Sequence, residues 1–197
     1  MKGLEQVDWL YDAAVTPINW LGLGAHRRRL VGDLAGDILE IGVGTGLNLA
    51  YYGPAARVTA IEINPDLLRT TVPRAARRGY RLQAGDAQSL PFRARSFDVV
   101  VSTLVFCTVP DPLAALEEIR RVLRPGGRLL QLEHTRTGRP IPDTVLDLIA
   151  PAWRLATGGC HPNRDTAALL TDRGWRLHHH ERRAGGLLRL LISTPPG

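Results

Sequence analysis

From residue 37 onward, short apolar segments alternate with segments that have the pattern of amphipathic helices. Residues 97–104, for example, contain an uninterrupted Val99-Val100-Val101 core, which is typical of a strand with both faces buried. Apolar strands joined by helices predict a parallel sheet covered on both sides, a doubly wound α/β fold. The predicted strands are residues 37–41, 57–62, 80–84, 97–104 and 128–133.

Three helices are expected between these strands. Asn64-Pro65 and Asp111-Pro112 each combine a good N-cap residue with a proline that suits the first helical position. The first of these helices should run to about residue 78 with a kink at Pro73, and the second should end before the turn at 125–127. A shorter helix, residues 47–52, is expected directly after a glycine-rich turn.

Two further strands, residues 175–183 and 187–194, are expected to close the sheet. Gly185-Gly186 between them predicts a hairpin and therefore an antiparallel pair at the sheet edge. We expect one domain over residues 1–197. Residues 1–30 and 140–165 stand outside its core, and both are expected to roof the edge where the strands end and ligands bind.

The composition excludes several classes of protein. The chain has 197 residues, of which 44% are hydrophobic and 22% charged, so it can form a full core. Its longest near-apolar run, residues 99–109, is too short for a bilayer span of roughly 20 residues, and its start does not resemble a secretory signal. The net charge of +6 is spread evenly, so nucleic-acid binding is not expected.

Cysteine usage points to a reduced compartment. Cys107 and Cys160 are the chain's two cysteines, far apart and without the spacing of a metal site. We therefore expect a cytoplasmic protein with no metal ion. The run of three histidines, residues 178–180, alternates across a predicted strand, so only two of them share a face, and it is not expected to bind metal either.

Three acidic residues stand at or just after the ends of three predicted strands. Glu40 lies near the end of the first, Glu62 ends the second, and Asp86 follows the third. The carboxyl ends of parallel strands meet at one edge of a sheet, so these carboxylates are expected to converge on one crevice. Taken singly, Glu62 has the alternative interpretation of a solvated acid at a strand end, which its spacing disfavours, and Asp86 is more typical of a turn former.

A glycine-rich turn lies beside the first of these acids. Gly42, Gly44 and Gly46 allow a tight turn and close approach of a ligand to the backbone. Their third glycine falls one position early for the dinucleotide fingerprint, which favours a nucleoside over a diphosphate. Glu62, 20 residues after Gly42, is spaced to bind the hydroxyls of a ribose, and Asp86 can accept a hydrogen bond from an adenine amino group.

With these motifs, residues 36–135 resemble the cofactor-binding core of the class I S-adenosylmethionine-dependent methyltransferases, whose sheet is Rossmann-like. Their first motif is matched by residues 40–46, and their turn before the fifth strand by residues 123–127. The resemblance implies an enzyme that uses S-adenosylmethionine as methyl donor and releases S-adenosylhomocysteine. The cofactor-binding residues that it implies are Tyr11, Glu40, Gly42, Gly44, Gly46, Glu62, Ile63, Asp86, Ala87 and Thr103.

In such families the first-motif acid lies near the methionine ammonium, and a Tyr-Asp pair in an N-terminal lid covers the cofactor. Glu40 and Tyr11 match these positions, although packing of an amphipathic helix would also account for Tyr11. Another interpretation of residues 4–30 is an interfacial helix, because Trp9 and Trp20 precede a run of three arginines that would suit an anionic membrane surface.

Several segments narrow the resemblance to thiol methyltransferases of the microsomal methyltransferase-like type. They are residues 103–109, Glu133-His134, residues 150–153 and Gly159-Cys160. This implies a small-molecule acceptor, most simply a thiol, in a pocket formed by Phe106, Cys107, His134 and Trp153. His134 is the candidate to deprotonate or orient the acceptor, unless it only caps the strand. The neighbouring His161 has no assigned role.

Two other methyltransferase classes share parts of the pattern. Bacterial phospholipid N-methyltransferases share residues 109–112 and a short basic N-terminal helix, and quinone-pathway C-methyltransferases share the general core. An acceptor of the phosphatidylethanolamine type, or another small molecule methylated on nitrogen, carbon or oxygen, therefore remains an alternative to the thiol. A binding module without catalysis is disfavoured by the intact set of acids.

Overall fold

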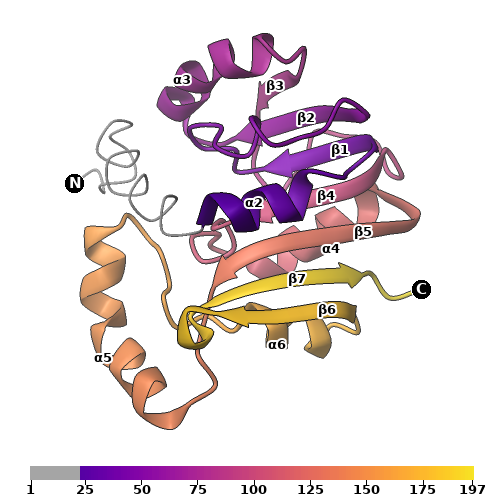
Figure 1. The fold of residues 1–197 in the computed structure, drawn as a ribbon. Coiled ribbons are helices and arrows are strands. Elements are labelled where there is room, and N and C mark those ends of the chain that lie inside the picture. Colours follow the sequence, from indigo (N-terminus) through magenta and orange to yellow (C-terminus); the bar gives the residue numbers. More distant parts are fainter. Residues whose placement is uncertain (1–22) are drawn as a thin grey trace.

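The computed structural model describes residues 23–197, and its core is a seven-stranded sheet with the order β3-β2-β1-β4-β5-β7-β6 (Figure 1). The first five strands are parallel, and β7 runs antiparallel to both β5 and β6. The strands are β1 (Gly36–Ile41), β2 (Ala56–Glu62), β3 (Arg81–Ala84), β4 (Phe97–Thr103), β5 (Leu123–His134), β6 (Arg176–Arg183) and β7 (Leu188–Thr194). The predicted fold, with its antiparallel edge pair, is confirmed.

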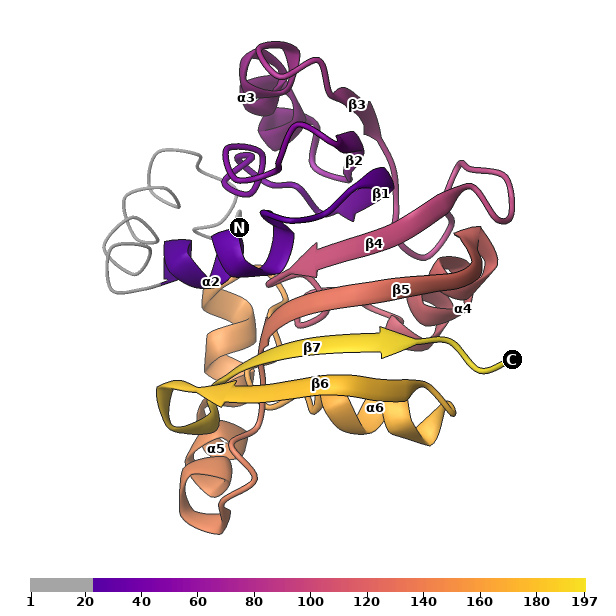
Figure 2. The ribbon, with the colours of Figure 1, turned by 45° about the vertical axis from the view of Figure 1, so that its right-hand side comes forward.

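Helices cover both faces of this sheet (Figure 2). One face packs against α4 and α6 through residues such as Leu39 and Leu116, and the other against α2 and α3 through residues such as Ile38 and Ala75. Because side chains alternate along a strand, Glu40 shares the face of Ile38. The helices are α2 (Gly24–Val31), α3 (Pro65–Ala76), α4 (Pro112–Val122), α5 (Pro140–Ala156) and α6 (Thr166–Asp172), with a short 3₁₀ turn, η3 (Ala184–Gly186), between β6 and β7.

Both predicted N-caps are present. The side chain of Asn64 accepts a hydrogen bond from the amide of Asp66, and that of Asp111 accepts from the amides of Leu113 and Ala114. Each cap satisfies amides that would lack a partner inside the helix. The two helices therefore start where the sequence places them, directly after β2 and shortly after β4.

The prediction of a helix at residues 47–52 is wrong, because this segment forms consecutive turns. Its amides bond three residues back, as from Leu49 to Gly46 and from Tyr51 to Asn48. Gly44 and Gly46 have positive φ angles, so the chain enters the segment from a backbone conformation that an α-helix does not use. The glycine turn is therefore not followed by the helix N-terminus that the sequence suggested.

The strand predicted at residues 128–133 is longer than expected. β5 starts at Leu123, which pairs with Phe97, and the register shifts before Arg128 pairs with Val99. The turn that the sequence predicts before the strand, residues 125–127, instead lies within the first half of β5, where the register shifts. The C-terminal half of β5 ends at His134, one residue beyond the predicted end.

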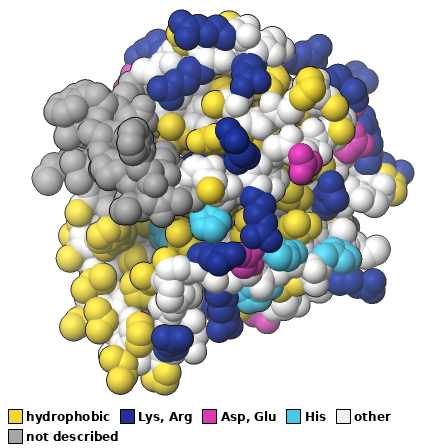
Figure 3. Space-filling view, viewed as in Figure 1, with side chains coloured by type: hydrophobic (Ala, Val, Ile, Leu, Met, Phe, Trp, Pro, Cys, Tyr) yellow, Lys and Arg dark blue, Asp and Glu magenta, His cyan; other side chains and the backbone are white. Residues whose placement is uncertain are grey.

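Helix α5 lies beside the end of the sheet where the parallel strands finish (Figures 1 and 2). Most of its large apolar side chains face solvent, and Figure 3 shows hydrophobic side chains gathered over this part of the surface. Ile141 and Leu148 are each 80% exposed and Leu155 is 83% exposed. Among residues 23–197, no helix combines the length and the apolar character needed to cross a membrane.

Part of the predicted lid cannot be compared with the structure. Tyr11, Trp9 and Trp20 lie outside the described residues, as does most of the segment 1–30. Within that segment, α2 packs through Leu30 and Val31 into the core on the face of the sheet that carries Glu40.

Candidate active site

Glu62 joins the glycine turn to the start of α3. Its side chain is 6% exposed at the last position of β2. One carboxylate oxygen accepts the amide of Gly44 at 2.9 Å, and the other accepts the amide of Asn64 at 3.0 Å. A methyl group added at Gly44 would meet no atom within 4 Å. Open space therefore lies beside the turn, next to an acceptor with lone pairs still available for hydroxyl groups.

The glycine turn offers a matched pair of substitutions. Gly42 and Gly44 both have positive φ angles, so alanine should cost about 1–2 kcal/mol at either position. Only at Gly42 would the new methyl group lie 2.6 Å from the side chain of Val105. Gly42→Ala is thus expected to lower the thermal midpoint clearly more than Gly44→Ala in scanning calorimetry. Equal midpoints would mean that the turn does not pack against Val105.

Glu40 belongs to a buried polar network that includes two residues the sequence did not identify. Its side chain is 2% exposed. The amide nitrogen of Asn48 donates to Glu40 Oε1 at 3.0 Å and to the hydroxyl of Thr103 at 2.9 Å. The guanidinium of Arg27, also buried, donates to the amide oxygen of Asn48 at 2.7 Å. The ends of β1 and β4 are thus linked to α2 through one asparagine.

The second carboxylate oxygen of Glu40 is buried and forms no hydrogen bond within residues 23–197, although the buried hydroxyl of Tyr52 lies close to this carboxylate. Burial raises the pKa of Glu40 to about 7, although Tyr52, Asn48 and Arg27 act in the opposite direction. A buried acceptor of this kind is costly, and a cationic donor such as an ammonium group would satisfy it. The ammonium group that the family resemblance predicts beside Glu40 would be such a donor.

Asp86 has the hydrogen bonds of a turn former. Its carboxylate accepts the backbone amide of Gln88 at 2.8 Å and the side-chain amide of Gln88 at 3.1 Å. The side-chain oxygen of Gln88 in turn accepts the amide of Asp111 at the N-cap of α4. Gln88, which the sequence analysis missed, thus orients this carboxylate. Nearby, Ala87 is buried, whereas Ile63, directly after β2, is 67% exposed.

A cluster of an imidazole and two thiols lies where β4 and β5 end. His134 Nε2 is 3.0 Å from the sulfur of Cys160, and the indole nitrogen of Trp153 donates to the same sulfur at 3.4 Å. The sulfur of Cys107 completes the group, whose ligand atoms all lie within 4.8 Å of one another. Both cysteines are buried and free. The sequence predicted Cys107, His134 and Trp153 for this place but not Cys160.

These contacts shift the pKa values of all three ionisable groups in the cluster. The hydrogen bond shared with Cys107, together with those from His134 and Trp153, lowers the pKa of Cys160 to about 4 despite burial. The same Cys160 hydrogen bond and burial raise the pKa of Cys107 well above its usual value. Burial acts to lower the pKa of His134, but the neighbouring Cys160 and Glu133 outweigh it and raise that pKa. The directions of the His134 and Cys160 shifts both favour an imidazolium beside a thiolate.

Glu133 fixes the loop that carries Cys107. Its buried carboxylate accepts the hydroxyl of Ser102 at 2.7 Å and the amides of Val105 and Phe106 at 3.2 and 3.3 Å. Phe106, predicted to line the acceptor pocket, is fully buried and belongs to the hydrophobic core on the α4 face. The backbone of Phe106 thus helps to hold the loop that carries Cys107. Of the two predicted aromatic pocket residues, Trp153, which is 45% exposed, is the more accessible.

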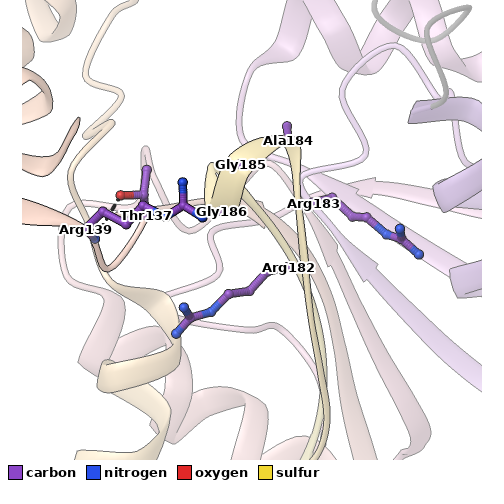
Figure 4. A pocket seen from close by; sticks show the side chains of 7 residues that line it. All are labelled: Thr137, Arg139, Arg182, Arg183, Ala184, Gly185 and Gly186. Carbon is purple, nitrogen blue, oxygen red and sulfur yellow. Dashed lines mark hydrogen bonds between the residues drawn. The ribbon is translucent and has the colours of Figure 1, made fainter. Parts of the chain in front are cut away.

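A separate pocket of about 320 Å³ opens beside the turn that joins β6 to β7 (Figure 4). None of the predicted site residues lines it. Its lining contains three arginines and no acidic residue, so its chemistry suits an anion. The lining residues are Thr137, Arg139, Arg182, Arg183, Ala184, Gly185 and Gly186.

Comparisons with known proteins establish the family. A family described as a methyltransferase domain matches residues 39–131. Thiol S-methyltransferase TMT1B of Rattus norvegicus is 31% identical over 168 residues, which cover 78% of this chain and 69% of the relative. The chain belongs to the class I S-adenosylmethionine-dependent methyltransferases.

Two further similarities bear on the acceptor and on the fold. Phosphatidylethanolamine N-methyltransferase of Cereibacter sphaeroides is 34% identical over 115 residues, which cover 55% of this methyltransferase and 57% of that one. A solved SAM-dependent methyltransferase from Thermotoga maritima has a TM-score of 0.73 at 18% identity and covers 98% of each chain. The latter shows the same fold.

S-adenosylmethionine is therefore the methyl donor of this methyltransferase. The residues present fit it, because open space lies beside Gly44 and a buried oxygen of Glu40 lacks a partner in residues 23–197. Which residues contact the donor stays a prediction. Glu62 would hold the ribose, Asp86 and Ala87 the adenine, and Glu40 the ammonium group.

Proposed function

We propose that this methyltransferase methylates the sulfur of a small apolar thiol. The observation that carries the proposal is the cluster of His134, Cys107 and Cys160 at the ends of β4 and β5. It lies on the same edge of the sheet as Thr103 and Glu62, which are predicted to contact the methyl donor. The similarity to thiol S-methyltransferase TMT1B over 69% of that relative supports the same acceptor class.

When bound, S-adenosylmethionine supplies a sulfonium methyl group that needs no further activation. The chain has to bind the two substrates, align the acceptor sulfur with the methyl carbon and exclude water. Glu62, Asp86 and Glu40 would hold the donor on the glycine-turn side. The His134 cluster would hold the acceptor sulfur as a thiolate, and Trp153 would form an apolar wall beside it.

Incubation of the purified protein with S-adenosylmethionine and a panel of alkyl and aryl thiols tests this proposal. Mass spectrometry should detect the S-methyl thioether and S-adenosylhomocysteine in equal amounts. His134→Ala is expected to lower turnover tenfold or more, since small misplacements of reacting groups are costly. His178→Ala, an exposed histidine on β6, is the control and should leave turnover unchanged. Full turnover in His134→Ala would show that His134 has no role in the reaction.

A second acceptor class has its own support. The exposed apolar side chains of α5 begin next to Arg139, which lines the arginine pocket. An apolar surface beside a basic one suits an anionic lipid surface, and a phosphatidylethanolamine N-methyltransferase is among the relatives. Vesicles that contain phosphatidylethanolamine therefore form a parallel arm of the same assay. N-methylated lipid without any thioether would replace the thiol proposal with this one.

A further inference from the structure

Cys107, His134 and Cys160 form a compact set of metal-ligating atoms drawn from three separate segments. Cys107 follows β4, His134 ends β5, and Cys160 follows α5. Their sulfur and nitrogen atoms all lie within 4.8 Å of one another, and both cysteines are free. Within residues 23–197 this is the one such group of three or more His, Cys, Asp or Glu side chains.

The donor set and its dimensions suit zinc. Bond lengths of about 2.3 Å to sulfur and 2.0–2.1 Å to nitrogen place the ligand atoms of a tetrahedral site about 3.6–3.8 Å apart. The observed 3.0 Å between His134 and Cys160, and separations of up to 4.8 Å overall, are within a small side-chain movement of that geometry. Two cysteines and one histidine are a ligand set of catalytic zinc sites, which keep a fourth position open.

The backbone around the cluster holds the three ligands together. The amide of His161 donates to the carbonyl of Cys107 at 2.7 Å, which joins two of the ligand segments directly. Arg164 donates to the carbonyl of Phe106 and, at 2.7 Å, to that of Val109, on either side of Cys107. Outer hydrogen bonds of this kind orient metal ligands. The indole of Trp153 adds one directly to the sulfur of Cys160.

We propose that Cys107, His134 and Cys160 bind one zinc ion and that the sulfur of the acceptor takes the fourth position. The second part of this inference rests on the thiol acceptor proposed above, whereas the first does not. Coordination releases the thiol proton to solvent and leaves a zinc-bound thiolate. This sulfur then forms the new bond to the methyl carbon, and the electron pair of the broken bond stays on the sulfur of the donor. The neutral thioether is a weak ligand and leaves.

Cobalt(II) is the probe of choice, because its thiolate complexes absorb near-ultraviolet and visible light whereas those of zinc do not. Protein treated with a chelator and a phosphine reductant is titrated with cobalt(II). One equivalent should saturate a thiolate-to-metal absorption band, and zinc should abolish it by displacement. Cys160→Ser and His134→Ala should each weaken cobalt binding by about 100-fold or more. Addition of an alkyl thiol should change the band of the parent protein.

The matched control replaces two exposed histidines. His178→Gln/His180→Gln removes two exposed imidazoles from the histidine run on β6 and should bind one cobalt ion as the parent does. Native mass spectrometry of the parent and this control, with zinc added, gives a second count that does not depend on how well Cys160→Ser folds. No bound metal in the folded parent, or loss of the metal only in the histidine control, would overturn the proposal.

Activity assays separate this inference from the proposed function. If chelator-treated protein methylates thiols as fast as zinc-loaded protein, zinc does not hold the acceptor, and the thiol function stands without it. If one zinc ion binds but no thiol yields a thioether, the metal site stands and the proposed acceptor is wrong.

Discussion

Replacing Glu62 by alanine is expected to lower the affinity for S-adenosylmethionine by about two to four orders of magnitude. A ribose bound at this position would donate two hydrogen bonds to a carboxylate, and each such bond contributes about 1.5–3 kcal/mol. The carboxylate is already fixed by the amides of Gly44 and Asn64, so little ordering is lost on binding. Isothermal titration calorimetry of the donor measures the change.

Two further variants make this result specific. Glu62→Gln keeps the volume of the side chain and one acceptor oxygen, so its affinity should lie between those of the parent and Glu62→Ala. Glu117→Ala removes an exposed glutamate on α4 that pairs with Arg120 and should bind the donor as the parent does. If Glu62→Ala is folded by circular dichroism and binds with unchanged affinity, the assignment of the ribose site is wrong.

The parts of the fold that the sequence predicted correctly depend on local patterns. Val99-Val100-Val101 signals a buried strand by itself, and Asn64 and Asp111 cap helices within three residues of their own position. Residues 47–52 were misassigned because their composition permits a helix. The positive φ angles of Gly44 and Gly46 instead set up turns, and these angles are visible only in three dimensions.

The residues of the candidate site also fall into two groups, those that local sequence patterns reveal and those that only tertiary packing brings together. Glu40, Glu62 and Asp86 could be found because each is placed by the end of its own strand. Cys160 could not, because its approach to His134 depends on the path of the chain through α5 and on the hydrogen bond from His161 to Cys107. The alternative interpretation of residues 4–30 would place the run of three arginines at a membrane surface, yet Arg27, the first of them, is buried against Asn48. No spacing rule links residues brought together by tertiary packing alone.

Glu40 is expected to make the ligand-free protein less stable as the pH rises from about 4.5 to 7. Burial raises the pKa of this carboxyl from 4.5 to about 7, so between these values the folded state holds a proton that the unfolded chain has released. The free energy of unfolding therefore falls with rising pH. At 1.36 kcal/mol per unit, the contribution of Glu40 amounts to about 3 kcal/mol.

Glu40→Gln isolates this contribution. Glutamine cannot ionise, so the difference in unfolding free energy between the parent and this variant should change by about 3 kcal/mol across the window, while all other titrating groups cancel. Urea denaturation at a series of pH values measures it. Glu117→Gln, at an exposed position on α4, should show no comparable change. A constant difference between the parent and Glu40→Gln would mean that Glu40 is not buried as the structure has it.

The same titration links stability to binding of the donor. Above pH 7 the ligand-free protein carries a buried carboxylate whose second oxygen lacks a partner within residues 23–197, and the ammonium group of S-adenosylmethionine would supply one. The donor should therefore raise the thermal midpoint of the parent more at pH 8 than at pH 5.5, because a ligand stabilises a protein according to its affinity for the folded state. In Glu40→Gln this extra stabilisation should disappear. If it persists, another group receives the ammonium.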